Sequence, residues 1–325
     1  MTDPAPAQPA SQLAISGALN RRAAIASVCV ALILAALKSY AVWRTGSIAM
    51  LGSLADTGLD FVASLVTLIA VRVAAQPADH HHRFGHGKAE ALAALFQVSL
   101  ISVAALGIII RSAQRFSSGG EPAAIEYGVG VSLVAIGLTL ALVWYQMRVV
   151  RLTGSVAINA DHLHYRSDLA LNVSVIAALV LEALLHLHGA DALFGLAIGV
   201  WLILNAWRTA THAIDQLMDK EWPREKRERF LAAAAGHPGL QGIHDLRTRS
   251  SGAHDFVQFH IWVDPAMTVA QAHTLMEALE ARLHAAFPGV ELLIHVDPVG
   301  QMDSDDPIAE RDVLADLKPA EGAKR

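Results

Sequence analysis

Six long apolar stretches limit this chain to a helical membrane protein. They lie at about 23–43, 47–75, 89–114, 125–149, 162–187 and 191–212. Each is near or above the roughly 20 residues that cross a bilayer as a helix. Six spans place both termini on one side of the membrane, and most of the Lys and Arg residues near the span ends fall on that side. The positive-inside rule therefore predicts that both termini are cytoplasmic.

The chain becomes polar after Met218, where the sequence DKEWPREKRER begins. The pattern beyond it predicts a helix at 224–235, strands at 242–249 and 254–263, a helix at 268–286 and a strand at 290–296. This αββαβ order indicates a small α+β domain. The predicted organisation is a six-helix transmembrane domain at 21–215 and a cytoplasmic domain at 216–300, between disordered tails at 1–20 and 301–325.

Composition excludes several functions. Hydrophobic residues make up 54% of the chain and charged residues only 17%, which is too apolar for an ordinary soluble protein. The formal net charge of −5 gives no basic surface for nucleic acid. The sequence has no G-x-x-x-x-G-K phosphate loop, so ATP is not expected as the energy source. The single cysteine, Cys29, forms neither an intramolecular disulfide nor a multi-thiolate metal site.

Two pairs of candidate ligands lie inside the apolar spans. The second span, SLADTGLDFVASLVTLIA, carries Asp56 and Asp60, although a carboxylate at the middle of a membrane helix costs roughly 2.5–3.5 kcal/mol. No cation is close to them in the sequence. The fifth span, in NADHLHYRSDLALN, carries His164 and Asp168. Residues at i and i+4 share one face of a helix, so each pair offers two ligands to one point.

Three carboxylates and one imidazole suit a divalent cation in a tetrahedral site. This donor set favours Zn²⁺ or Fe²⁺, with Mn²⁺ and Cd²⁺ as alternatives. The competing interpretation of an intramembrane carboxylate is a capped or paired helix residue. Asp161, at the start of the fifth span, is interpreted in this way, as a helix cap and not a metal ligand.

The link between the second and third spans, QPADHHHRFGHGKAE, contains a second candidate metal site. Asp79, His82 and His86 have the chemistry of ligands, and glycines allow the short loop to fold tightly around an ion. The alternative is a solvated polar loop that happens to be rich in histidine. His80 and His81 are interpreted as bystanders.

The cytoplasmic domain contains a third candidate set. His295 and Asp297 are two residues apart on one predicted strand and so share a face, and His260 lies near the end of another strand. His244 and His273 complete the set. Taken singly, each histidine could equally be a surface or core residue, so the residues alone leave both interpretations open.

Four motifs together give the chain a family resemblance. They are QPAD…H.FGHGKAE, AD.LHY.SD, HDLRTR.SG and IH.DP, with D-x-x-x-D in the second span and H-x-x-x-D in the fifth. With six spans and a metallochaperone-like, ferredoxin-like cytoplasmic domain, the chain resembles the cation diffusion facilitators, most closely the bacterial ferrous-iron and zinc efflux pump type. The resemblance covers about residues 20–300.

The resemblance implies a homodimeric antiporter in the bacterial inner membrane that exports Zn²⁺, Fe²⁺ or Cd²⁺ in exchange for protons, without an organic cofactor. It implies the following roles: a transport site of Asp56, Asp60, His164 and Asp168; a loop site of Asp79, His82 and His86; a cytoplasmic site of two ions at His244, His260, His273, His295 and Asp297; and a charge interlock between protomers at Lys88 and Asp219. Two positions depart from the family pattern. His162 replaces an apolar residue, and Val296 replaces a polar one.

Two other classes of protein are alternatives to a transporter. A membrane-embedded metal-dependent enzyme would use denser carboxylate clusters with Lys or Arg partners for a Mg-diphosphate substrate. A metal sensor would explain the histidines of the cytoplasmic domain but not carboxylates on two membrane spans. Antiport also agrees with the residue chemistry, because an imidazole with an ordinary pKa near ~6.5 binds either a proton or a metal around neutral pH.

Overall fold

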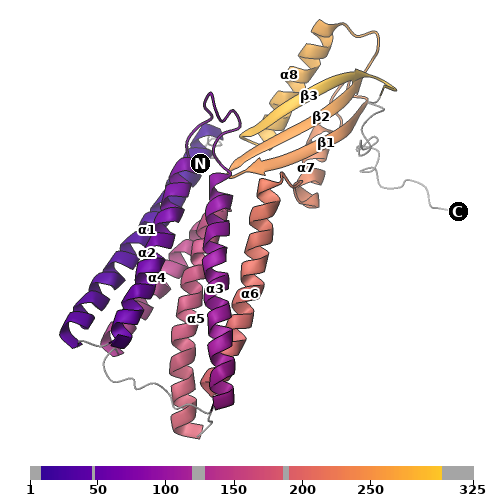
Figure 1. Cartoon of the computed structure of the whole chain (residues 1–325). Helices are drawn as coiled ribbons and strands as arrows, with labels where there is room; N and C mark the ends of the chain where they lie inside the picture. Colours follow the sequence, from indigo (N-terminus) through magenta and orange to yellow (C-terminus); the bar gives the residue numbers. More distant parts are fainter. Residues whose placement is uncertain (1–8, 46–47, 119–128, 186–189, 302–325) are drawn as a thin grey trace, which may run out of the picture. The chain divides into compact units, whose positions relative to one another are not determined.

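The computed structural model describes residues 9–45, 48–118, 129–185 and 190–301. It divides into two compact units: Ile15–Asp215, and a second that comprises the residues up to Ala14 and those from Gln216 onward. The first unit is built from six helices (Figure 1). They are α1 (Pro9–Thr45), α2 (Ile48–Ala74), α3 (Ala89–Ser118), α4 (Val129–Thr153), α5 (Val156–Leu185) and α6 (Ala190–Leu217). The prediction of a helical membrane domain is confirmed.

The helices extend beyond the apolar stretches that predicted them. Helix α1 begins at Pro9, inside the segment assigned to a disordered tail, while residues 1–8 and 302–325 lie outside the described residues. Over the described residues, five of these six helices are apolar enough to cross a membrane, and α5 is the exception. Helix α5 differs because its first half carries charged side chains, including Asp161 and Asp168.

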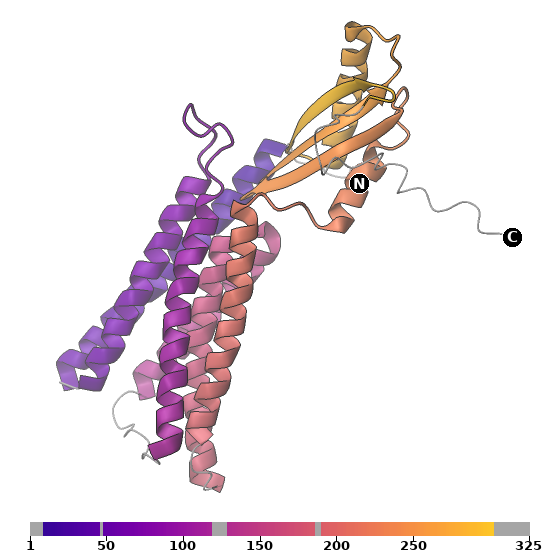
Figure 2. The ribbon, with the colours of Figure 1, turned by 45° about the vertical axis from the view of Figure 1, so that its right-hand side comes forward.

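Small residues bring the membrane helices close together. Ala23, Ala70, Ala93 and Ala157 lie in one buried cluster that joins α1, α2, α3 and α5. On α6, Gly195 and Gly199 face α3 so closely that an added Cβ at Gly199 would lie 2.5 Å from a side-chain carbon of Ile109. Figure 2 shows α3 and α6 side by side. Spacing of this small-xxx-small type allows backbones to approach in a bilayer.

The second unit is an αββαβ domain, as predicted. It contains α7 (Arg224–Ala234), β1 (Gly242–Ser251), β2 (His254–Val263), α8 (Val269–Ala286) and β3 (Val290–Pro298). The sheet order is β1-β2-β3, with β1 antiparallel and β3 parallel to β2. Thr268 and Gln271 form a capping box that starts α8.

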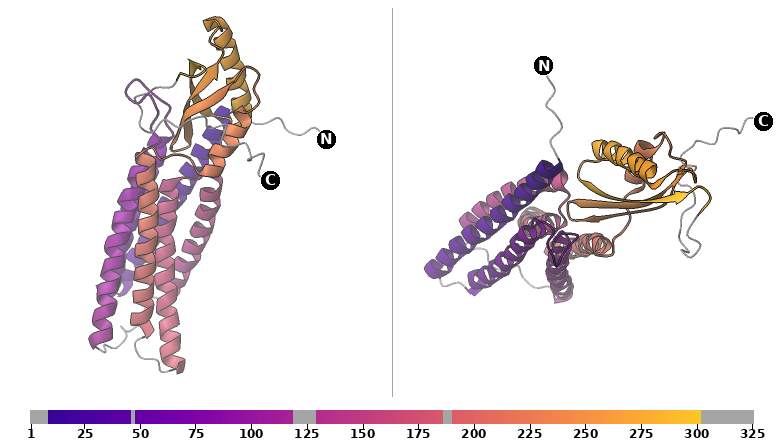
Figure 3. Two further views of the ribbon diagram at one scale, coloured as in Figure 1. Left: turned by 90° about the vertical axis from the view of Figure 1, so that its right-hand side faces the viewer. Right: turned by 90° about the horizontal axis from the view of Figure 1, so that it is seen from above.

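Both helices cover the same face of this sheet (Figure 3). Phe230 of α7 and Leu279 of α8 pack with Phe259 and Ile261 of β2 in the core. Because side chains alternate along a strand, the residues between these, such as His260, point to the uncovered face. Val296 packs against the core, so its departure from the family pattern leaves the uncovered face unchanged.

Candidate metal-binding sites

Helices α2 and α5 bring three predicted ligands together inside the membrane unit. His164 Nε2 lies 2.9 Å from Asp60 Oδ1 and 3.7 Å from Asp168 Oδ2. One ligand atom from each of these residues falls within 4.8 Å of the others. The side chains are partly buried, with 14% of His164 and 22% of Asp60 exposed. A divalent cation could therefore bind nitrogen and oxygen donors from two helices at once.

Asp56, the fourth predicted ligand, is not part of this cluster. It lies one helical turn before Asp60 and is exposed. Lys38 was missed by the sequence reasoning, which found no cation near the two aspartates. Its Nζ donates to the Ser53 carbonyl, at 3.1 Å, and to Thr57 Oγ1, at 2.6 Å. The sequence feature that could have indicated Lys38 is the short link between the first two helices, because it places the end of α1 beside the start of α2.

Asp161 does not cap α5, and that prediction is wrong. The helix begins at Val156, and the hydroxyl of Ser155 accepts a hydrogen bond from the Ile158 N–H in the first turn. Asp161 lies inside the helix and is fully buried. The apolar stretch that predicted this span began too late in the sequence, which made an interior residue look terminal. His162, the departure from the family pattern, is also buried and lies outside the cluster.

The loop after α2 gathers the second set of predicted ligands. Asp79 Oδ2 lies 3.4 Å from His86 Nε2, and Asp79 Oδ1 lies 3.6 Å from His82 Nδ1. Gly85 has a φ of 77°, which a glycine adopts without strain. The backbone N–H groups of His82 and His81 donate to Asp79 and hold the pKa of this carboxyl below its usual value. The carboxylate is therefore ionised and available to a cation at neutral pH.

Three histidines form a row across the uncovered face of the cytoplasmic sheet. His244 of β1 is paired with His260 of β2, which is paired with His295 of β3. Asp297 bridges them, because its Oδ2 lies 2.9 Å from His260 Nδ1 and 3.2 Å from His244 Nε2, and its Oδ1 lies 3.1 Å from His295 Nε2. The pKa of His244 is lowered mainly by burial and to a smaller extent by the nearby His260. Its imidazole therefore stays neutral and able to bind metal.

Asp245 is a further acidic residue at this row, and the sequence reasoning missed it. Neighbouring strand residues normally point to opposite faces, but β1 is irregular between His244 and Arg247, and Asp245 has a φ of 47°. Its Oδ2 consequently lies 3.7 Å from His260 Nε2. His273, by contrast, is not in the row. It is exposed on α8, with Nε2 3.4 Å from Glu277 Oε1, and α8 covers the other face of the sheet.

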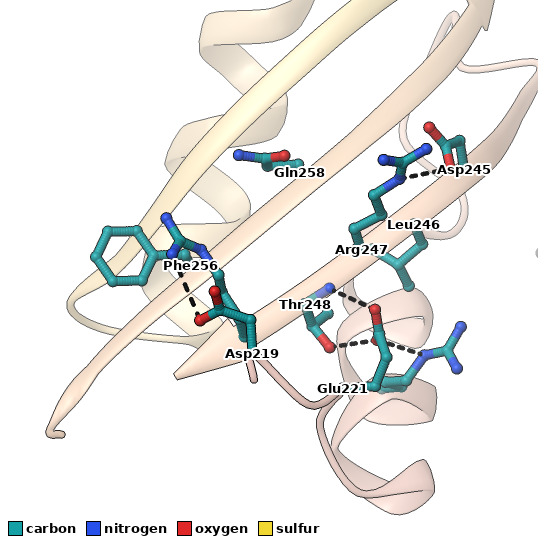
Figure 4. Close-up of a pocket in the computed structure, with 10 residues that line it drawn as sticks. Asp219, Glu221, Asp245, Leu246, Arg247, Thr248, Phe256 and Gln258 are labelled. Carbon is teal, nitrogen blue, oxygen red and sulfur yellow. Dashed lines mark hydrogen bonds and ion pairs between the residues drawn. The ribbon is translucent and has the colours of Figure 1, made fainter. Parts of the chain in front are cut away.

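A cavity of about 440 Å³ opens beside β1 and the segment that leads into α7 (Figure 4). Its charged side chains pair with one another rather than converging on a point. The pairs are Arg247 Nε with Asp245 Oδ1 at 3.0 Å, Arg249 Nη1 with Asp219 Oδ1 at 3.5 Å and Arg227 Nε with Glu221 Oε2 at 3.6 Å. Because these charges are balanced within the cavity wall, the metal clusters are better candidates for the functional sites.

The two remaining predicted residues, Lys88 and Asp219, belong to different compact units. Asp219 has a φ of 55° and pairs with Arg249 of its own domain. Their predicted role concerns two protomers and stays a prediction.

Carboxylates and an imidazole gathered between two membrane helices, with histidine clusters in a loop and a separate domain, define a class of membrane protein that handles divalent metal cations. Comparison with known proteins agrees with this class. The family model described as the cation efflux transmembrane domain matches residues 24–218, and that of the cation efflux protein cytoplasmic domain matches residues 222–299.

The chain belongs to the cation efflux family, also called the cation diffusion facilitators. The cation-efflux pump FieF of Cronobacter sakazakii is 43% identical over 282 residues, which cover 87% of this chain and 94% of that pump. FieF of Pectobacterium atrosepticum is 43% identical over 277 residues, covering 85% and 92%. The metal-bound C-terminal domain of the CzcD transporter from Thermotoga maritima is 24% identical and covers 25% of this chain and 100% of that one, with a TM-score of 0.24. Family membership identifies a transporter rather than an enzyme.

Proposed function

We propose that this protein exports a divalent metal cation from the cytoplasm in exchange for protons. The transport ligands are Asp60, His164 and Asp168, and Asp56, which lies outside their cluster, stays the predicted fourth ligand. The substrates with matching ligand preference are Zn²⁺ and Fe²⁺, followed by Cd²⁺ and Mn²⁺. The observation that carries the proposal is the 2.9 Å approach of His164 Nε2 to Asp60 Oδ1, between two different membrane helices. Binding of one cation by both helices links its occupancy to their relative position, which alternating access requires.

Exchange for protons follows from the chemistry of the imidazole. A proton on His164 Nε2 occupies the lone pair that a metal ion needs, so metal and proton exclude each other at this atom. The described geometry places that nitrogen at hydrogen-bonding distance from Asp60, a partner for its proton when no metal is bound. A pH difference of one unit supplies about 1.4 kcal/mol for each proton that enters, which can drive the exchange.

The proposed assembly is a homodimer in a bacterial inner membrane, with both termini in the cytoplasm. Asp79, His82 and His86 would bind a second ion in the loop. The row of His244, His260, His295 and Asp297 would bind regulatory ions. Because α8 lies on the other face of its own sheet, His273 could complete such a site only in a second copy of the chain. Metal in that position would connect the two protomers.

Transport into liposomes that contain a Zn²⁺ dye tests the proposal. With an imposed pH gradient, the wild-type protein should move Zn²⁺, and the rate should fall when the gradient is abolished. Asp60→Ala removes one ligand and should abolish the flux. Asn205→Ala is the matched control, because Asn205 Nδ2 donates to the Trp201 carbonyl within its own helix, α6. Wild-type flux in Asp60→Ala would falsify the transport site, and flux that ignores the pH gradient would rule out proton antiport.

A further inference from the structure

Asp161 is the centre of a buried polar cluster that joins five membrane helices. Its Oδ2 accepts hydrogen bonds from Ser27 Oγ of α1, at 2.6 Å, and from Gln146 Nε2 of α4, at 2.7 Å. Its Oδ1 accepts from Gln97 Nε2 of α3, at 3.0 Å, and from Ser64 Oγ of α2, at 3.5 Å. We infer that Asp161 is a positioning residue, which fixes α5 so that His164 and Asp168 meet Asp60 at the transport site.

The cluster depends on the carboxylate as a double acceptor. Gln97 and Gln146 are fully buried, and both direct their amide nitrogens to Asp161. The carbonyl oxygens of the same two amides have no hydrogen-bond partner among the described residues. Each buried acceptor left unpaired costs about 1–3 kcal/mol. Because the two glutamines leave both carbonyl oxygens unpaired, their amide nitrogens must donate to a strong acceptor. Asp161 is that acceptor.

The cluster lies one helical turn from the proposed metal ligands on both helices. On α5, Asp161, His164 and Asp168 follow the spacing i, i+3 and i+7 and share one face. On α2, Ser64 follows Asp60 by one turn. Helices α2 and α5 therefore meet at two successive contacts, Asp60 with His164 and, one turn away, Ser64 with Asp161. Ser64 Oγ also lies 2.9 Å from Tyr165 Oη.

This arrangement determines the rotation of α5 about its own axis. If α5 turned, the carboxylate would lose donors on four other helices at once, in a medium that offers no water to replace them. The orientation of the only imidazole in the transport site is tied to that rotation. Residues that orient metal ligands typically change metal affinity by 10–100-fold when they are altered. The inference rests on the proposed transport site and extends it to a residue that binds no metal.

An exchange of donor and acceptor tests the role. Asp161→Asn keeps the shape but places an amide nitrogen against the donors that face it, and it should weaken Zn²⁺ binding at the transport site by about tenfold or more. Gln146→Glu alone adds a second buried carboxylate beside the first and should also weaken binding. In the double variant the amide donor is on α5 and the carboxylate acceptor is on α4, the reverse of the wild type. The hydrogen bond between them is restored, so the Zn²⁺ affinity should return toward that of the wild type.

The measurement is Zn²⁺ and Mn²⁺ titration calorimetry on the full-length protein in detergent, together with liposome flux. The part of the Zn²⁺ isotherm that Asp60→Ala removes defines the transport site. A change in the ratio of Zn²⁺ to Mn²⁺ affinity, and its recovery in the double variant, would not arise from a loss of stability alone. Ser102→Ala is the control, because its hydroxyl donates to the Val98 carbonyl of its own helix.

Two results would overturn the inference in different ways. Wild-type Zn²⁺ binding in Asp161→Asn, with binding lost in Asp60→Ala, would leave the transport site intact and refute the role of Asp161. Wild-type binding in Asp60→Ala would refute the transport site and with it the positioning role. If Asp161→Asn is not recovered as folded protein, Ser64→Ala removes a single donor, and its Zn²⁺ affinity must then fall several-fold below that of Ser102→Ala.

Discussion

Lys38 supplies the positive charge that the acidic start of α2 lacks in the sequence. Its ammonium group is bound to the Ser53 carbonyl and the Thr57 hydroxyl, on either side of Asp56 in the chain. A carboxylate in a bilayer without a compensating charge is costly, and a fixed cation nearby lowers that cost whenever no metal is bound. The same charge repels an arriving divalent cation, so Lys38 should weaken metal binding while helping release.

Lys38→Met should therefore tighten Zn²⁺ binding at the transport site, on the order of tenfold, since like charges repel strongly in a medium of low dielectric constant. Transport should become slower, because release would limit the rate. Lys38→Arg keeps the charge and should remain close to the wild type in affinity. Calorimetry and liposome flux on the three proteins provide the measurement. A Lys38→Met protein with unchanged or weaker Zn²⁺ affinity would show that the charge does not act on the site.

At the scale of elements, hydrophobic periodicity predicted the helices and strands but not their ends. Apolar runs mark the part of a helix that lipid surrounds, whereas α1 extends back to Pro9 and α5 extends back through the polar Asp161 and Asn159 to Val156. This difference is why Asp161 was mistaken for a cap. Ligand pairs at i, i+4 were predictable because they follow from helix geometry alone. Contacts that depend on tertiary packing, such as that of Lys38 with Thr57, were not.

The irregular strand β1 illustrates the same limit in the cytoplasmic domain. Strict alternation correctly placed His295 and Asp297 on one face of β3. It gave no sign of the bulge in β1 that brings Asp245 to the same face. The row also predicts how the domain responds to pH. Burial lowers the pKa of His244 below its ordinary value, so the folded domain resists protonation at a pH where the unfolded chain already accepts the proton.

Stability should accordingly fall as the pH drops through about 6.5, the ordinary pKa of histidine, and stop falling below the lowered pKa of the folded state. The test uses residues 216–301, which have a core of their own, in urea unfolding with a chelator at pH 7.5 and 5.5. His244→Asn should lose less stability between these two values than the wild type, because its side chain does not titrate. The exposed His284→Asn is the control. An equal loss in all three proteins would contradict the assignment to His244.

For the whole molecule, the proposed homodimer requires contacts between protomers. The family resemblance implies a pair between Lys88 of one protomer and Asp219 of the other. Asp219 is 39% exposed and also lies 3.5 Å from Arg249, so this pair is partly screened by solvent and shared with a second cation. Its contribution should be modest, about 1 kcal/mol or less.

A charge exchange distinguishes a pair between protomers from two independent surface charges. Lys88→Asp and Asp219→Lys should each lower the fraction of dimer and the Zn²⁺ flux, because each places like charges together. The double variant restores opposite charges and should recover part of both. Recovery should be incomplete, since the lysine introduced at position 219 would lie beside Arg249. Cross-linking yield and liposome flux form a double-mutant cycle, with Lys88→Arg as the charge-preserving control. If the double variant is no better than the worse single variant, Lys88 and Asp219 do not pair, and the dimer must be held at other contacts.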